Sequence, residues 1–128
     1  MSAEHIRDFV RRYLGALSGK DKTPELVEQW ITDEGLKEHI ALFEAAFPRY
    51  WLKAEDMIVE GDKVAVRASF GGTHQGDLMG IAPTGKEISG DGILIYRIEN
   101  DKVVEFWPAF DQLTILQQLG VIPPPGEG

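Results

Sequence analysis

The most regular alternation in the chain is the stretch Val64-Ala65-Val66-Arg67-Ala68-Ser69-Phe70. Its even-numbered positions are all apolar, whereas the odd-numbered positions include Arg67 and Ser69. A period of two is that of a β-strand with one buried face. The stretch therefore predicts a β-strand. The same period of two is the pattern to look for in the rest of the second half of the chain.

Further strands are predicted on both sides of this one. Residues 50–60 form the preceding strand, and residues 88–99 form a long strand that follows. Asn100-Asp101 turns the chain, and residues 102–110 return as the hairpin partner. Because each strand follows its neighbour through a short turn, we expect an antiparallel sheet.

The first part of the chain follows the helical period instead. Apolar side chains recur at helical spacing from Ile6 to Leu17, and Ser2 can cap that helix. Two more helices are predicted, one at Thr23-Pro24 and one after Asp33. Helices followed by strands indicate an α+β fold. We expect a cone-shaped barrel, in which a strongly curved antiparallel sheet has its concave face covered by these helices around a pocket.

The composition fits one domain with a short tail. A chain of 128 residues is long enough to close one hydrophobic core. We expect a single domain over residues 1–122 and a flexible tail at 123–128, which holds no core residues. There is no apolar signal region at the N-terminus and no apolar run long enough for a membrane span. A cytoplasmic location and no membrane partner are therefore predicted.

Charge and histidine spacing exclude several classes of function. The net charge is −8, and Lys and Arg do not cluster as phosphate binding requires, so nucleic acid is not an expected partner. The chain has no cysteine, and His5, His39 and His74 lie far apart in the sequence. We therefore predict no metal site and assign no role to His5 or His39.

One segment carries several short motifs in a fixed order. They are Gly72-Thr73-His74-Gln75-Gly76, Pro83-Thr84-Gly85-Lys86, Arg97-Ile98 with Lys102-Val103, Glu105 and Trp107, then Asp111 and Gln118-Leu119-Gly120. Together they resemble the SnoaL-like polyketide cyclase family, within the group of folds similar to nuclear transport factor 2. The specific part of the resemblance covers residues 70–122.

The resemblance implies an α+β barrel, open at one end, whose pocket holds the substrate. It implies ring closure of an aromatic polyketide by an intramolecular aldol step, without metal or organic cofactor. It also implies that Asp111 is the acid/base residue and that His74 lies near the same pocket, so both are candidate catalytic residues. Such cyclases carry a second histidine on the strand before the last hairpin, where this chain has Ile93-Leu94-Ile95. The candidate substrate-binding residues are Trp107, Tyr96, Asp91, Phe70 and Met79.

The chemistry expected of Asp111 sets a requirement on its surroundings. An aldol or isomerisation step begins with removal of a proton alpha to a carbonyl. A carboxylate with an ordinary pKa of roughly 4 is a weak base, so it must lose water to gain strength. Asp111 is flanked by Trp107, Phe110 and Leu113, which could exclude that water. General-base catalysis would then supply about 10²–10⁴-fold.

Each candidate also has a purely structural interpretation. Asp111 precedes a helix predicted at 112–119 and could be its N-cap. His74 could be a hydrogen-bonded histidine at a strand end, and Trp107 could belong to the core. Asp91 could be a second pocket carboxylate or a solvated rim residue.

Three functions are compatible with the sequence. The favoured one is a cofactor-independent cyclase or isomerase that acts on a hydrophobic carbonyl compound. The others are a protein that binds a small apolar ligand without chemistry, and an interaction or assembly domain. The resemblance alone cannot decide among them, because one fold hosts many functions. We also predict a homodimer, since residues 50–60 and 64–70 carry apolar side chains on both faces.

Overall fold

The computed structural model describes residues 2–122 of the chain, so the tail predicted at 123–128 lies outside the described residues. In chain order its elements are α1 (Ala3–Leu17), α2 (Pro24–Glu28), α3 (Glu34–Ala46), β1 (Trp51–Glu60), β2 (Lys63–Thr73), β3 (Glu87–Glu99), β4 (Lys102–Phe110) and α4 (Gln112–Gln118). Every predicted helix and strand is present, and the α+β class is confirmed. Within residues 2–122 no helix is both long and apolar enough to cross a membrane.

The three N-terminal helices begin at polar caps. The side chains of Ser2, Thr23 and Asp33 each accept a hydrogen bond from the backbone N–H three residues later, at 3.1, 3.2 and 2.8 Å. These contacts satisfy N–H groups that the first turn of a helix leaves without a partner. The helix starts are therefore encoded by residues only a few positions apart.

The four strands form one antiparallel sheet in the order β1-β2-β3-β4. The expected curved antiparallel sheet under N-terminal helices is confirmed. Strands β1 and β4 do not pair with each other, so the sheet is not closed. Four strands are too few to close around a core, since small closed barrels have about eight. At the β4 edge Ile31 forms a parallel bridge with Val103, and α1 packs near β1.

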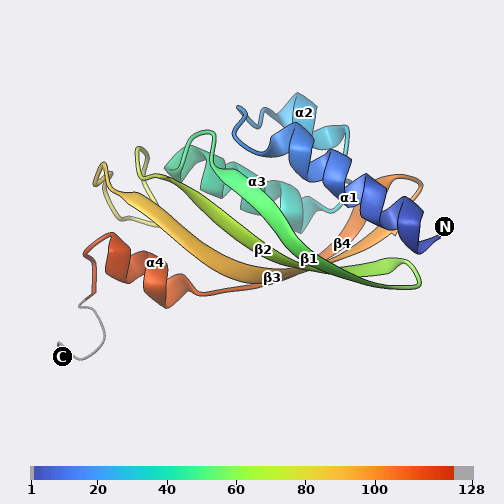
Figure 1. Ribbon diagram of the computed structural model, residues 1–128. Coiled ribbons are helices and arrows are strands. Elements are labelled where there is room, and N and C mark those ends of the chain that lie inside the picture. The colour runs from blue at the N-terminus through green and yellow to red at the C-terminus, as the bar shows by residue number, and fades with distance from the viewer. Residues whose placement is uncertain (1, 123–128) are drawn as a thin grey trace.

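The helices lie on both sides of the sheet. Helices α1, α2 and α3 cover its concave face, and α4 lies beyond β3, away from them (Figure 1). The even-numbered side chains Val64, Val66 and Ala68 of β2 face the apolar stripe of α1 and are buried. A second, smaller apolar cluster joins the end of α3 to α4; it consists of Ala46, Phe47, Leu78, Ile88, Ile115 and Leu119.

A β-bulge changes the phase of the last hairpin. Ile98 pairs with Val103, but Arg97 pairs with Glu105, so Val104 is an extra residue in β4. The Arg97 and Glu105 side chains also form an ion pair. Beyond the bulge the alternation is reversed, as it must be when one residue is inserted into a strand of period two.

Candidate functional site

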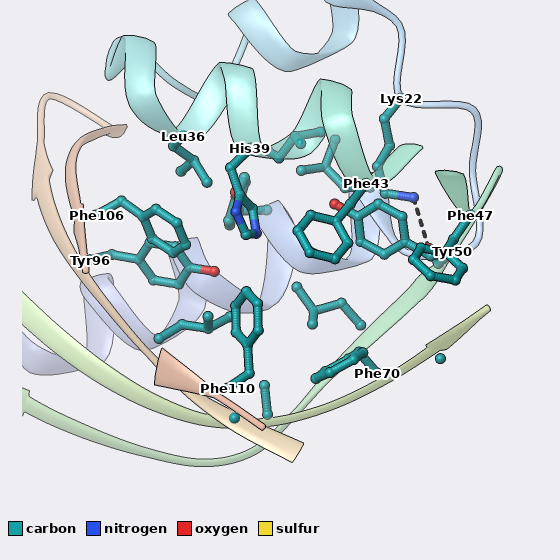
Figure 2. Close-up of a pocket in the computed structure, with 18 of the residues that line it drawn as sticks. Lys22, Leu36, His39, Phe43, Phe47, Tyr50, Phe70, Tyr96, Phe106 and Phe110 are labelled. Carbon is teal, nitrogen blue, oxygen red and sulfur yellow. Dashed lines mark hydrogen bonds between the residues drawn. The ribbon is translucent and has the colours of Figure 1, made fainter. Parts of the chain in front are cut away.

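An interior cavity lies between α3 and the concave face of the sheet (Figure 2). Its volume is about 60 Å³. Most of its wall is aliphatic or aromatic. The lining residues come from the helices and from all four strands: Tyr13, Leu17, Lys22, Leu36, His39, Ile40, Phe43, Phe47, Tyr50, Leu52, Ala68, Phe70, Gly71, Ile88, Gly92, Leu94, Tyr96, Phe106 and Phe110.

The imidazole side chain of His39, on α3, faces this cavity. Its ring centroid lies 4.6 Å from that of Phe43, 5.3 Å from that of Phe106 and 5.4 Å from that of Phe110. Figure 2 shows the imidazole pointing from α3 into the space between these rings. Burial lowers the pKa of His39 to about 4, so the ring is neutral at pH 7.

Two phenol hydroxyls point into the same space. Figure 2 shows Tyr96 and Tyr50 directing their oxygens into the cavity from opposite sides of His39. Burial raises the pKa of both phenols well above the ordinary value, so they stay protonated at neutral pH. Protonated phenols can donate a hydrogen bond to a carbonyl oxygen or to an enolate.

Lys22 positions Tyr50 at the far end of the cavity. Its ammonium group donates to the Tyr50 carbonyl oxygen at 2.7 Å and lies 3.9 Å from the centroid of the Tyr50 ring. It also pairs with Glu44 at 3.3 Å and donates to the Lys20 carbonyl at 3.1 Å. Burial lowers the pKa of Lys22, and Glu44 opposes that shift. The Lys22 charge is therefore engaged with protein groups.

Asp111 lies outside the interior cavity. It caps α4, because its carboxylate accepts a hydrogen bond from the Thr114 N–H at 3.0 Å and another from the Thr114 hydroxyl at 2.6 Å. The hydroxyl is the main reason why the pKa of Asp111 is lowered. The expected burial by flanking aromatic residues is wrong, since the Asp111 side chain is exposed. The reason is that β4 ends at Phe110 and the capping turn directs the carboxylate toward solvent.

An outer depression holds Asp111 instead. It lies where the starts of β1, β3 and α4 meet, and Phe70 lines both this depression and the interior cavity. Two carboxylates and several hydroxyls give it a polar character, in contrast to the cavity. Its lining residues are Trp51, Ser69, Phe70, Ser89, Gly90, Asp91, Asp111 and Thr114.

His74 is completely buried and lines neither space. Its Nδ1 accepts a hydrogen bond from the Thr84 N–H at 3.1 Å, and its ring packs on Phe47 at 5.5 Å. Its backbone bonds to Gly85 and Lys86, at 2.9 and 2.8 Å, tie the same loop together. Nε2 has no partner within residues 2–122. His74 and Asp111 therefore share neither the interior cavity nor the outer depression, and the contacts of His74 are those of a histidine that holds a loop.

The candidate substrate-binding residues are divided between the two faces. Tyr96 and Phe70 line the interior cavity, and Asp91 lines the outer depression. Trp107 is 42% exposed beneath Lys63 on the outer face, so the core interpretation was wrong. Met79 is 68% exposed at a turn with a positive φ of 46°.

Comparison with known proteins places the chain in a family. The model of the SnoaL-like polyketide cyclase family matches residues 15–119. The chain belongs to the SnoaL-like polyketide cyclase family. The match confirms the resemblance carried by the motifs of residues 70–122 and extends it toward the N-terminus as far as residue 15. A comparison with curated proteins gives no significant match to this SnoaL-like chain.

Solved structures share the SnoaL-like fold over most of the chain. AclR from Streptomyces galilaeus, a candidate hydroxylase, has a TM-score of 0.81 at 24% identity, covering 98% of this chain and 87% of its own. TsrD from Streptomyces laurentii has a TM-score of 0.79 at 23% identity, covering 95% and 99%. A candidate polyketide cyclase from Bacillus cereus has a TM-score of 0.70 at 28% identity, covering 95% and 87%.

The sequence analysis of this SnoaL-like protein missed His39. A signal for it was present, because His39 lies three residues after Leu36 and four before Phe43, on the apolar stripe of α3. A histidine on such a stripe faces the interior together with its neighbours. Among residues 2–122 there is no group of three or more acidic or histidine side chains arranged to hold a metal ion.

Proposed function

We propose that the protein binds a small, neutral, hydrophobic carbonyl compound in the interior cavity and converts it by a cofactor-independent cyclisation or isomerisation. One observation carries the proposal: the polar groups that face this apolar cavity are a neutral imidazole and protonated phenols. Pockets for small molecules combine apolar walls with a few convergent polar groups in this way. Membership of the SnoaL-like polyketide cyclase family supports a cyclase-like reaction.

The absence of a free charge in the wall favours a neutral ligand. Within the described wall, the charged side chain is Lys22, and its ammonium group already contacts Glu44, Tyr50 and Lys20. An ion moved into such a space without a counter-charge loses hydration worth several kcal/mol. A neutral ketone avoids that loss, and its oxygen can accept a hydrogen bond from a phenol.

The reaction follows from the chemistry of a carbonyl compound. Removal of a proton from the alpha carbon breaks the C–H bond and leaves an enolate, whose oxygen accepts a hydrogen bond. In a cyclisation the enolate carbon then forms a C–C bond to a second carbonyl carbon, and the new alkoxide takes up a proton. The resemblance assigns the proton transfer to Asp111, with His74 nearby; both roles stay predictions, since neither residue lines the cavity.

Binding can be tested with β-tetralone, a neutral bicyclic ketone, by saturation-transfer NMR. We expect the wild-type protein to bind it. Ala68→Leu should abolish binding, because Ala68 is buried in the cavity wall and a larger side chain fills the space. Ala41→Leu is the matched control, since Ala41 is exposed on α3 and does not line the cavity. Equal binding by Ala68→Leu and the control would place the ligand elsewhere.

A second candidate function is binding of the same ligand class without chemistry. It is favoured by the geometry of Asp111, which is exposed and whose two carboxylate oxygens both accept hydrogen bonds from Thr114 at the start of α4. The two functions differ in one measurement: a binding protein holds the ketone without accelerating exchange of its alpha protons. The cytoplasmic location and the lack of a nucleic-acid partner stay predictions.

We further propose that two copies of the chain pair through the outer face of the sheet. Ile58, Ala65, Ile95 and Trp107 form a row across all four strands, and Ile58 is 69% exposed. Exposed apolar rows of this kind mark surfaces that a partner covers. Sedimentation at tens of micromolar should give a dimer mass, and Ile58→Lys should shift it toward monomer. A monomeric wild-type mass would contradict the pairing.

A further inference from the structure

We infer that His39 is the residue that removes and returns the proton in the interior cavity, with the hydroxyls of Tyr50 and Tyr96 as donors to the enolate oxygen. The inference rests on the proposed function and assigns its catalytic group. It differs from the role that the sequence predicts for Asp111. The argument starts from the ionisable side chains that line the cavity: Tyr13, Lys22, His39, Tyr50 and Tyr96.

Elimination among these groups leaves one base. The tyrosines are held in the protonated form by burial, so they can donate a hydrogen bond but cannot accept a proton. The Lys22 ammonium group donates to two carbonyl oxygens and pairs with Glu44, which holds it away from a ligand. His39 is neutral, and a neutral imidazole has a nitrogen lone pair that can take a proton.

The setting of His39 restricts where that lone pair can point. Phe43, Phe106 and Phe110 contact its ring at centroid distances between 4.6 and 5.4 Å. These neighbours offer no hydrogen-bonding groups of their own in their side chains. The ring is therefore held among apolar surfaces, with its nitrogens toward the cavity (Figure 2). A ligand oriented by a phenol on either side would present its alpha carbon to this ring.

The proton balance closes without another reactant. His39 takes the alpha proton and becomes an imidazolium, while the electron pair of the C–H bond forms the enolate. The negative oxygen accepts a hydrogen bond from a tyrosine hydroxyl, and the nearby imidazolium stabilises it in a site with little water. The enolate carbon then attacks the second carbonyl, and the imidazolium returns its proton to the alkoxide that forms.

Asp111 is less suited to this step on two counts. It lines the outer depression and not the cavity. Its carboxylate already accepts two hydrogen bonds from Thr114.

The test measures hydrogen–deuterium exchange at the alpha carbon of β-tetralone in D₂O by proton NMR. The wild-type protein should accelerate exchange over buffer, and His39→Gln should reduce that acceleration by about 10²–10⁴-fold. Binding of β-tetralone by this variant should be largely retained, because Gln is polar and similar in size to His. His5→Gln is the matched control, because His5 lies on the exposed surface of α1.

A second variant separates catalysis from folding. His39→Ala leaves space that free imidazole can enter, so added imidazole should restore exchange to this variant and not to His39→Gln. Restoration would show that the lost group is a proton carrier rather than a packing element.

The outcomes separate the two proposals. If wild-type protein does not bind β-tetralone, the proposed function fails and the role of His39 fails with it. If it binds but does not accelerate exchange, or if His39→Gln exchanges as fast as wild type, the inference is overturned while the binding cavity stands. Loss of exchange in Asp111→Asn with retention in His39→Gln would give the role to Asp111.

Discussion

The interior cavity and the outer depression differ in how their surroundings shift the pKa of the side chains that line them. In the cavity, burial among aromatic rings lowers the pKa of His39 and raises that of Tyr96. In the depression, hydrogen bonds from Thr114 lower the pKa of the exposed Asp111. Phe70 is a lining residue of both spaces. The comparison shows that the position of an ionisable side chain decides its charge state: inside the cavity it is kept neutral, and in the outer depression it is a solvated charge.

The largest expected difference between the two regions is in packing. Tyr96→Ala should lower the free energy of unfolding by about 3–5 kcal/mol, because Tyr96 is 1% exposed and its loss leaves a cavity in the core. Trp51→Ala, in the outer depression, should cost about 1 kcal/mol, since Trp51 is 42% exposed. Urea unfolding of the two variants measures this difference. Equal losses would mean that the depression is packed as tightly as the cavity.

The next difference is in the response to pH. The pKa of His39 is about 4 in the folded protein and about 6.5 in the unfolded chain, so the unfolded chain binds a proton first as pH falls. The stability owed to neutral His39 is complete above pH 6.5 and is lost as pH falls toward 4. The loss is at most about 3 kcal/mol.

His39→Gln should remove this slope of stability between pH 6.5 and 4, and His5→Gln should keep it. Asp111 acts in a lower window, because its pKa is depressed: its contribution is present above its ordinary pKa of 3.8 and is lost below it. Urea midpoints measured at several pH values separate the two. An unchanged slope in His39→Gln would contradict the burial of the imidazole.

The smallest expected effect concerns the helix cap in the outer depression. Asp111→Ala removes the cap of α4 and should lower the free energy of unfolding by about 1 kcal/mol. Asp111→Asn keeps an oxygen that can accept the Thr114 N–H, so its loss should be well under 1 kcal/mol. Thermal unfolding of both variants provides the measurement. Equal losses in Asn and Ala would show that capping is not what the carboxylate contributes.

Much of the fold could be predicted from the sequence because its signals are local. Ser2, Thr23 and Asp33 cap helices through N–H groups three residues away, and the alternation in residues 64–70 reports the buried face of β2 directly. The family also follows from short motifs. Such signals depend only on the spacing of residues along the chain, so they can be recognised from the sequence alone.

The site depended on features that spacing does not report. A strand of unbroken period two would place Val103 and Trp107 on one face. The bulge at Val104 instead directs Phe106 into the cavity and Trp107 to the outside. Asp111 follows Phe110 by one residue, yet it faces solvent while Phe110 lines the cavity.

The sequence by itself determined the order of the elements, the buried stripes and the family. The tertiary structure decided that the sheet stays open, that His39 and not Asp111 faces the cavity, and that His74 holds a loop. The physical reason is that a cavity is built by α1, α3 and four strands at once. The curvature and bulges of the sheet decide which side chains line the cavity, and both depend on contacts between residues far apart in the chain.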